Sequence, residues 1–235
     1  MVDIRLSVAV MHVPGADPER NLLVRRLRNQ FARVEVVRDL DRSGCWPTSL
    51  RAAKAIAPGA THHMVLQDHA TVPDVGALHR AIEAAPEDWI CPYVPRKELV
   101  EVEGNWAHSQ GVWGTANVAP VQLWDEYRRW VTEWTMQAKT DHDDRRMSAW
   151  LMATGRTARI PVPNLVDHTG VKSLLGHSRA VSRSSRVLVT RDRAEPPVWG
   201  SPDGKNISTV AVKDVVKNVD PDKVDQWQLA RVANL

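Results

Sequence analysis

Apolar positions along the chain follow two spacings that alternate with each other. Short apolar or alternating runs, typical of strands, cover residues 4–11, 34–37, 64–66, 88–94, 111–118 and 158–162. Apolar residues at helical spacing cover residues 17–31, 48–57, 74–85, 120–134 and 140–154. Strands that alternate with helices in this way predict an α/β fold, in which helices cover a sheet.

Turn and capping residues set the predicted ends of these elements. Asp17, followed by Pro18, and Asp74 are both placed as helix N-caps. Gly44–Pro47 reads as a turn before the helix at 48–57. Pro92 places the strand at 88–94 at a sheet edge or a bulge, and Gly104–Gln110 reads as a polar loop.

The most informative strand is the apolar run Met64–Leu66, which ends in Gln67-Asp68-His69. Pro58-Gly59 precedes it and Pro73-Asp74 follows it, so it reads as a short buried strand. Ligands of open α/β sheets bind beyond the carboxyl ends of strands. An acid and an imidazole at that point suggest a metal or phosphate site. The alternative is a solvated strand end.

A second group of polar residues opens the helix predicted over 140–154. Asp143 and Asp144 lie four and three residues before the apolar Met147, so either carboxyl can face inward in the first turn. Thr140 or Asp141 can cap this helix, and acids also favour the positive end of the helix dipole. Ordinary capping is therefore the alternative to a catalytic role.

Composition limits the classes of protein without selecting one. The 235 residues suit one domain over 1–180 with an extension over 181–235. No apolar run approaches the ~20 residues of a membrane span, and the N-terminus shows no signal peptide. With Cys45 and Cys91 in no metal-type or disulfide spacing, we expect a reduced, cytoplasmic protein with no membrane partner, in the host cytoplasm if the chain is viral.

The charge is mildly basic. The net charge of +3 and the isoelectric point of about 9.0 are compatible with an anionic partner but do not require nucleic acid. The arginines of the first helix, which read as a solvated face, are Arg20, Arg25, Arg26 and Arg28. The ten tryptophans can stack on bases or sugars, although most are expected in the core.

Several segments, taken in order, resemble a known family. They are Trp46 with Arg51, the Val65–His69 strand end, Trp113–Ala116, the acidic pair, and Pro163–His168 before a polar loop. In this order they resemble the small GT-A glycosyltransferases found in phages, over roughly residues 4–180. The resemblance implies a GT-A-like, nucleotide-sugar-binding, Rossmann-type mixed sheet flanked by helices.

The resemblance also implies a metal site and a catalytic base. Asp68, His69 and His168 would hold Mn²⁺ or Mg²⁺, which would neutralise the leaving diphosphate. The chain departs from the family at His69, where the usual second acid is absent. A strand-end acid contributes little packing, so we expect Asp68 to be replaceable without loss of the fold. Asp144 matches the general base for the acceptor hydroxyl, with Asp143 as the alternative.

The remaining implied contacts concern the UDP-sugar donor and its acceptor. The residues expected to bind the donor are Asp39, Trp46, Arg51, Gln67, Trp113, Gly114 and Lys172, with Arg179 as a weaker candidate. Of these, Trp113 and Gly114 would form the wall for the sugar or the acceptor.

For the acceptor, the resemblance points to a 5-hydroxymethylated pyrimidine in phage DNA, or to a glycan. The basic stretch Arg179–Arg193, together with Trp106 and Trp199 as exposed candidates, favours DNA, whose base would have to be flipped out of the stack. Two alternatives remain: a glycan- or lipopolysaccharide-type glycosyltransferase, and a non-catalytic nucleic-acid-binding module on the same fold. An NAD enzyme is disfavoured because no Gly-x-Gly-x-x-Gly follows the first strand.

Overall fold

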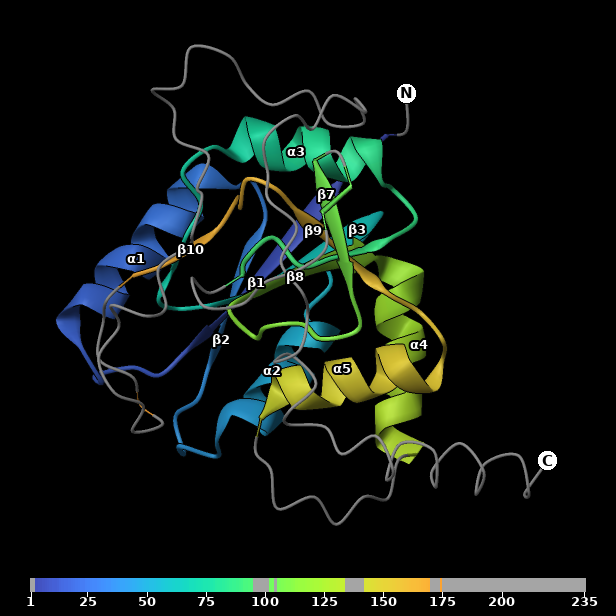
Figure 1. Cartoon of the computed structure of the whole chain (residues 1–235). Helices are drawn as coiled ribbons and strands as arrows, with labels where there is room; N and C mark the ends of the chain where they lie inside the picture. The colour runs from blue at the N-terminus through green and yellow to red at the C-terminus, as the bar shows by residue number, and fades with distance from the viewer. Residues whose placement is uncertain (1–2, 95–101, 104, 134–141, 170–173, 175–235) are drawn as a thin grey trace.

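The computed structural model describes residues 3–94, 102–103, 105–133, 142–169 and 174, and these form one mixed α/β sheet covered by helices (Figure 1). The helices are α1 (Pro18–Gln30), α2 (Cys45–Lys54), α3 (Val75–Ala84), α4 (Val121–Glu133) and α5 (Asp143–Ala153). The strands are β1 (Leu6–His12), β2 (Val34–Arg38), β3 (His62–Gln67), β4 (Ala70–Thr71), β5 (Trp89–Ile90), β6 (Val102–Glu103), β7 (Trp106–Ser109), β8 (Ala116–Pro120), β9 (Ala158–Pro161) and β10 (Asp167–His168).

Within the described ranges, eight strands form the main sheet in the order β2-β1-β3-β8-β5-β9-β7-β6. Strands β1, β2 and β3 are mutually parallel, whereas β8 runs antiparallel to β3. Strand β10 pairs with β4 in a separate two-stranded sheet. The sheet confirms the predicted fold class, and its parallel part brings the carboxyl ends of β1, β2 and β3 to one edge.

The core has two layers because side chains alternate across the strands. From β1, Val8 and Val10 pack on the face covered by α1 and α3, while Ala9 and Met11 pack on the opposite face. Figure 1 shows α1 and α3 on one side of the sheet and α2, α4 and α5 on the other. The second layer is built on aromatic side chains in tilted and edge-on contact, namely Trp89, Trp124, Tyr127 and Trp150.

Two of the predicted helix starts are confirmed, and a third is wrong. Asp17 and Asp74 cap α1 and α3, since their carboxylates accept from the backbone N–H groups of Glu19 and Ala77. Helix α2 begins at Cys45, so the segment expected to be a turn forms its first turn. Proline is tolerated there, because the first N–H groups of a helix have no partner within it.

The predictions for the second half of the sheet need three corrections. The segment expected to be a polar loop contains β7, whose Trp106 and Ala107 pair with Pro161 and Ile160 of β9. Strand β8 begins only at Ala116, after a loop. Strand β5 ends before Pro92 and lies inside the sheet, between β8 and β9, so the proline terminates the strand and does not mark an edge.

Some predictions fall on residues that the structure does not describe. They are the extension over 181–235, the basic stretch Arg179–Arg193, the candidate contacts Lys172 and Trp199, and the candidate caps Thr140 and Asp141. Among the described residues, no helix has both the length and the apolar character that a membrane span requires.

Candidate active site

The candidate active site lies where β3 ends, beside the loop that enters β8. Because β8 runs antiparallel to β3, with Leu66 opposite Ala116, the residues that precede β8 lie next to Gln67. The backbone N–H of Gln67 donates to the carbonyl of Thr115 over 3.0 Å. The predicted donor-site residues Gln67, Trp113 and Gly114 are therefore neighbours.

The first turn of α5 places Asp143 against this point. The Cys45 thiol at the start of α2 donates to Asp143 Oδ1 over 3.1 Å. A Cβ atom built on Gly114 would lie 2.7 Å from Asp143 Oδ1 and 2.9 Å from Gln67 Nε2. Three elements thus converge on one carboxyl group, and any larger side chain at position 114 would have to displace it.

Replacement of Gly114 by alanine is therefore expected to displace the Asp143 carboxyl. Overpacking of this kind typically lowers the free energy of unfolding by about 1–3 kcal/mol, and chemical denaturation of Gly114→Ala measures it. In the double variant Gly114→Ala/Asp143→Ala the clashing carboxyl is gone, so the two losses should be less than additive. Additive losses would mean that the added methyl group does not meet Asp143.

The two acids at the start of α5 have different surroundings. Asp143 is 2% exposed, and its Oδ2 is buried with no hydrogen-bond partner among the described residues. Burial and the neighbouring charge of Asp144 raise the pKa of Asp143 to about 7. Asp144 is less buried, and its Oδ1 accepts from the backbone N–H of Arg145. Burial also raises the pKa of Asp144.

The raised pKa of Asp143 predicts a pH-dependent stability. Its folded pKa exceeds the ordinary value of 3.8, so between these two values the folded protein holds a proton that the unfolded chain has released. The free energy of unfolding should therefore fall as pH rises towards 7, with a slope of up to about 1.4 kcal/mol per pH unit. Urea denaturation across this range should show a flatter dependence for Asp143→Asn, and an unchanged slope would contradict the assignment.

Asp68, the predicted metal ligand, lies in a different cluster at the same edge. It is 3% exposed, and its Oδ2 accepts from His12 Nδ1 over 2.9 Å and from the backbone N–H of Val13 over 3.1 Å. Its Oδ1 pairs with the buried guanidinium of Arg20. Burial alone would raise the pKa of Asp68, but hydrogen bonds from His69 and His12 and the charge of Arg20 hold it below its ordinary value.

The structure brings the three predicted metal ligands together, but not as a ligand set. His69 Nδ1 lies 3.7 Å from Asp68 Oδ1, and the rings of His69 and His168 lie 4.1 Å apart. Both oxygens of Asp68 already accept from protein donors, and a guanidinium lies against one of them. Among the described residues, no group of three His, Cys, Asp or Glu side chains is placed to hold a metal ion. The residues at Asp68 thus do not fit a divalent cation.

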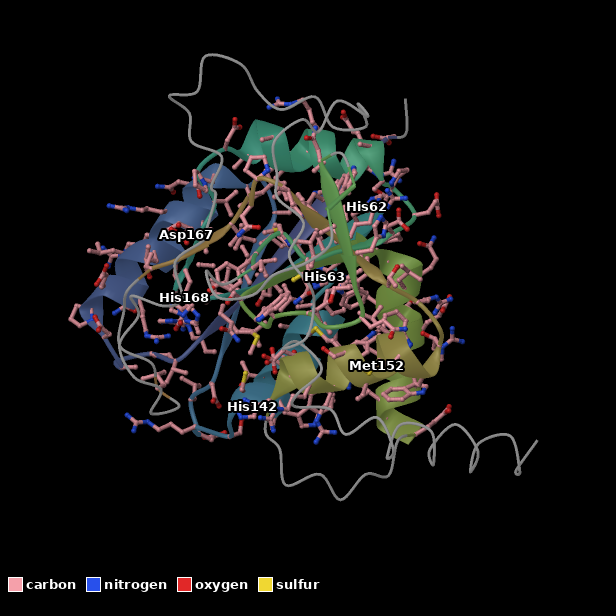
Figure 2. The ribbon with its side chains drawn as sticks, viewed as in Figure 1. His62, His63, His142, Met152, Asp167 and His168 are labelled. Carbon is pink, nitrogen blue, oxygen red and sulfur yellow. The ribbon has the colours of Figure 1, made fainter. Side chains whose placement is uncertain are left out.

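The acidic pair and the histidines occupy separate parts of the edge. Figure 2 shows His142, which directly precedes Asp143 at the start of α5, well apart from His168 on β10. The labelled His62 and His63 on β3 belong to neither group. His63 is bonded to Ser7 Oγ and to the carbonyl of Ala52, and burial lowers its pKa to about 4, so it is a neutral core residue.

The predicted donor contacts that follow β2 and lie on α2 form a third group. Asp39 is buried and accepts from the hydroxyl and the backbone N–H of Ser43 and from the N–H of Gly44. Burial opposes ionisation, but these bonds and the charge of Arg51 lower the pKa of Asp39. Arg51 remains partly exposed at 46%. The guanidinium of Arg146 lies 4.3 Å above the Trp46 ring.

Two interpretations from the sequence are wrong. Trp106, taken as an exposed tryptophan, is 5% exposed on β7. Arg20, taken as part of a solvated face, is 3% exposed and pairs with Asp68. The sequence also gave no indication of Cys45 or His12, because each acquires its role from a residue more than 50 positions away.

No protein-family model matches the chain, and no curated protein matches it. Solved structures match the chain at low identity, and two of them show the level of similarity. One is 4-diphosphocytidyl-2C-methyl-D-erythritol synthase from Anaerococcus prevotii, with a TM-score of 0.39 and 8% identity over 67% of this chain and 87% of that chain. The other is a mutant of Drosophila β-1,4-galactosyltransferase 7 in complex with manganese, UDP-Gal and xylobiose, with a TM-score of 0.44 and 11% identity over 76% of each chain. At these TM-scores the likenesses do not assign an activity to this chain.

Proposed function

We propose that the chain is a nucleotide-sugar-dependent glycosyltransferase whose general base comes from the acidic pair Asp143–Asp144. One observation carries this proposal. A buried carboxyl group with a raised pKa, that of Asp143, accepts from the Cys45 thiol and lies against Gly114, beside the end of β3. Titratable groups with shifted pKa values in such a position are typical of catalytic sites.

The pair suits base catalysis because its two carboxyls share one environment. Two adjacent, buried carboxylates do not both ionise readily, so the more buried one retains a proton. Asp143, whose Oδ2 meets no hydrogen-bond partner in the part of the chain that the structure describes, would hold that proton. Asp144 is the less buried of the two, so it is the group that can reach an acceptor hydroxyl, and its ionised form would accept the proton. Asp144 is therefore the base, and the protonation of Asp143 influences the ionisation of Asp144.

The donor would lie between the β2–α2 turn and the loop before β8. Arg51 is an exposed cation of this region, and a guanidinium suits a phosphate through paired hydrogen bonds. Asp39 holds the turn in which Ser43 and Gly44 lie, and the half-buried Trp113 of the loop before β8 would contribute a ring. A divalent metal would neutralise the leaving diphosphate, but no step is assigned to it because Asp68 does not fit as its ligand.

The proposed acceptor is a 5-hydroxymethylated pyrimidine in DNA. It is based on the basic stretch Arg179–Arg193 of the sequence, since Trp106 is buried and adds no stacking surface. A glycan acceptor would use the same base. Both classes therefore enter the test as separate arms.

Thermal unfolding with a panel of nucleotide sugars tests the donor proposal. A ligand at 100 times its dissociation constant stabilises the folded state by about 2.7 kcal/mol, so a matching donor should raise Tm clearly. Each donor is tested with Mn²⁺ and with a chelator. Donors that stabilise are then assayed for turnover with hydroxymethylated duplex DNA, unmodified DNA and a glycan. If no nucleotide sugar raises Tm, the proposed function is wrong, and binding of DNA alone would support the non-catalytic module.

A further inference from the structure

The contact between Cys45 and Asp143 joins two elements that are 98 positions apart in the sequence. Cys45 is the first residue of α2 and Asp143 the first residue of α5. The thiol sulfur lies 3.1 Å from Asp143 Oδ1 and 3.8 Å from Gln67 Nε2. Cys45 is thus the side chain of α2 that touches the catalytic acid pair.

The thiol is the donor in this contact. Burial and the nearby charge of Asp143 both raise the pKa of Cys45 far above its ordinary value, so the sulfur keeps its proton. A carboxylate oxygen has no proton to give when ionised, and Oδ1 is therefore the acceptor. This direction of bonding makes Cys45 a partner for the ionised form of Asp143.

The two carboxyl oxygens of Asp143 have different surroundings because of this contact. Oδ1 accepts from the thiol and lies against the Cα of Gly114, where no Cβ would fit. Oδ2 is buried and has no hydrogen-bond partner among the described residues. Oδ2 is therefore the oxygen that would carry the proton of the neutral acid, while the S–H bond restrains the rotation of the carboxyl group.

We propose that Cys45 is a positioning residue, which orients the Asp143 carboxyl through its S–H···Oδ1 hydrogen bond and thereby sets the protonation of the Asp143–Asp144 pair. It does not react and does not touch the substrate. The catalytic meaning of this role rests on the proposed function, but the hydrogen bond and its effect on Asp143 do not.

The physical consequence is a shift in the titration of Asp143. A donor that bonds the ionised form lowers the pKa of an acid, and the Cys45 hydrogen bond acts in this direction on Asp143. Its removal in Cys45→Ala should raise the pKa of Asp143 by about one pH unit. Cys45→Ser keeps a donor of similar size, so it should leave that pKa closer to the wild-type value.

Carbon-13 NMR of the side-chain carboxyls measures this titration in the full chain without any assay of activity. The Asp143 signal is identified by its disappearance in Asp143→Asn. A higher pKa in Cys45→Ala that is restored in Cys45→Ser supports the proposal. An unchanged pKa in Cys45→Ala, or equal shifts in both variants, overturns it. Thermal unfolding of each variant confirms that the folded protein is the one measured.

The pH dependence of turnover then separates this inference from the proposed function. Where a donor and an acceptor support turnover, the acidic limb of the kcat/KM profile should move in Cys45→Ala and return in Cys45→Ser. A purely structural role for Cys45 would lower Tm and leave the limb in place, which contradicts the proposal. If the NMR titration shifts as expected but no acceptor is ever glycosylated, the positioning role stands and the proposed function fails.

Discussion

Asp144→Asn is expected to lower kcat about 10²–10⁴-fold while the affinity for the nucleotide sugar stays nearly unchanged. A positioned general base contributes a factor of this size to the rate. Asn has the shape of Asp but cannot accept the proton of the acceptor hydroxyl. The Oδ1 of Asp144 accepts from the backbone N–H of Arg145, and an amide oxygen can replace it there, so the fold should persist.

Asp143→Asn is the matched control, because it changes the other acid of the pair in the same way. It should lower kcat less and should move the pH profile, since it removes the group that shares a proton with Asp144. Turnover of Asp144→Asn and Asp143→Asn is compared with donor binding measured by calorimetry. If Asp143→Asn abolishes turnover while Asp144→Asn retains it, the two roles are exchanged. Full activity of both variants on every acceptor would contradict an acid pair in catalysis.

The sequence was sufficient to predict those parts of the fold that depend on interactions between residues close together in the chain. The strand at Met64–Leu66 and the caps at Asp17 and Asp74 follow from apolar runs and capping side chains, and the structure has them. The start of α2 was missed because Gly44–Pro47 carries turn residues that also fit a helix start. For the confirmed strand and caps, and also for the missed start of α2, the residues that determine the structure lie within a few positions of one another.

The functional residues were harder to predict, since their partners lie far along the chain. The inward direction of Asp143 followed from helical spacing, but its contact with Cys45 and its close approach to Gly114 depend on how α2, α5 and β8 pack. Asp68 shows the opposite case. A strand-end acid beside a histidine suggested a metal ligand, and the arginine that neutralises it comes from α1, where spacing alone indicated a solvated face.

Asp68→Ala is therefore expected to lower the free energy of unfolding by about 3–5 kcal/mol. The substitution removes the Asp68 carboxylate from the buried guanidinium of Arg20, and removal of one partner from a buried ion pair has a cost of this size. His12 and the backbone N–H of Val13 lose their acceptor in the same variant. The sequence-based expectation that Asp68 could be replaced without loss of the fold is thus reversed.

The loss of unfolding free energy in Asp68→Ala should depend on pH, and a second variant serves as its control. The folded pKa of Asp68 is lowered, so its contribution is present above the ordinary carboxyl pKa and disappears as pH falls through the folded pKa. Wild type and Asp68→Ala should therefore approach each other in stability at acid pH. Asp41→Ala, which changes an exposed acid, should alter stability by no more than about 0.5 kcal/mol.

Measurements on Asp68 variants distinguish a structural role of Asp68 from a role as a metal ligand. In Asp68→Leu/Arg20→Met both charges of the pair are absent, so urea denaturation should show a smaller loss than in Asp68→Ala. A metal ligand would behave differently, because Asp68→Ala would then keep its stability without metal and lose only the rise in Tm that Mn²⁺ gives with a nucleotide sugar. An unchanged stability of Asp68→Ala, together with that loss, would restore Asp68 as a metal ligand. A large loss of stability with a chelator present assigns Asp68 to the buried cluster that ties α1 to the end of β3.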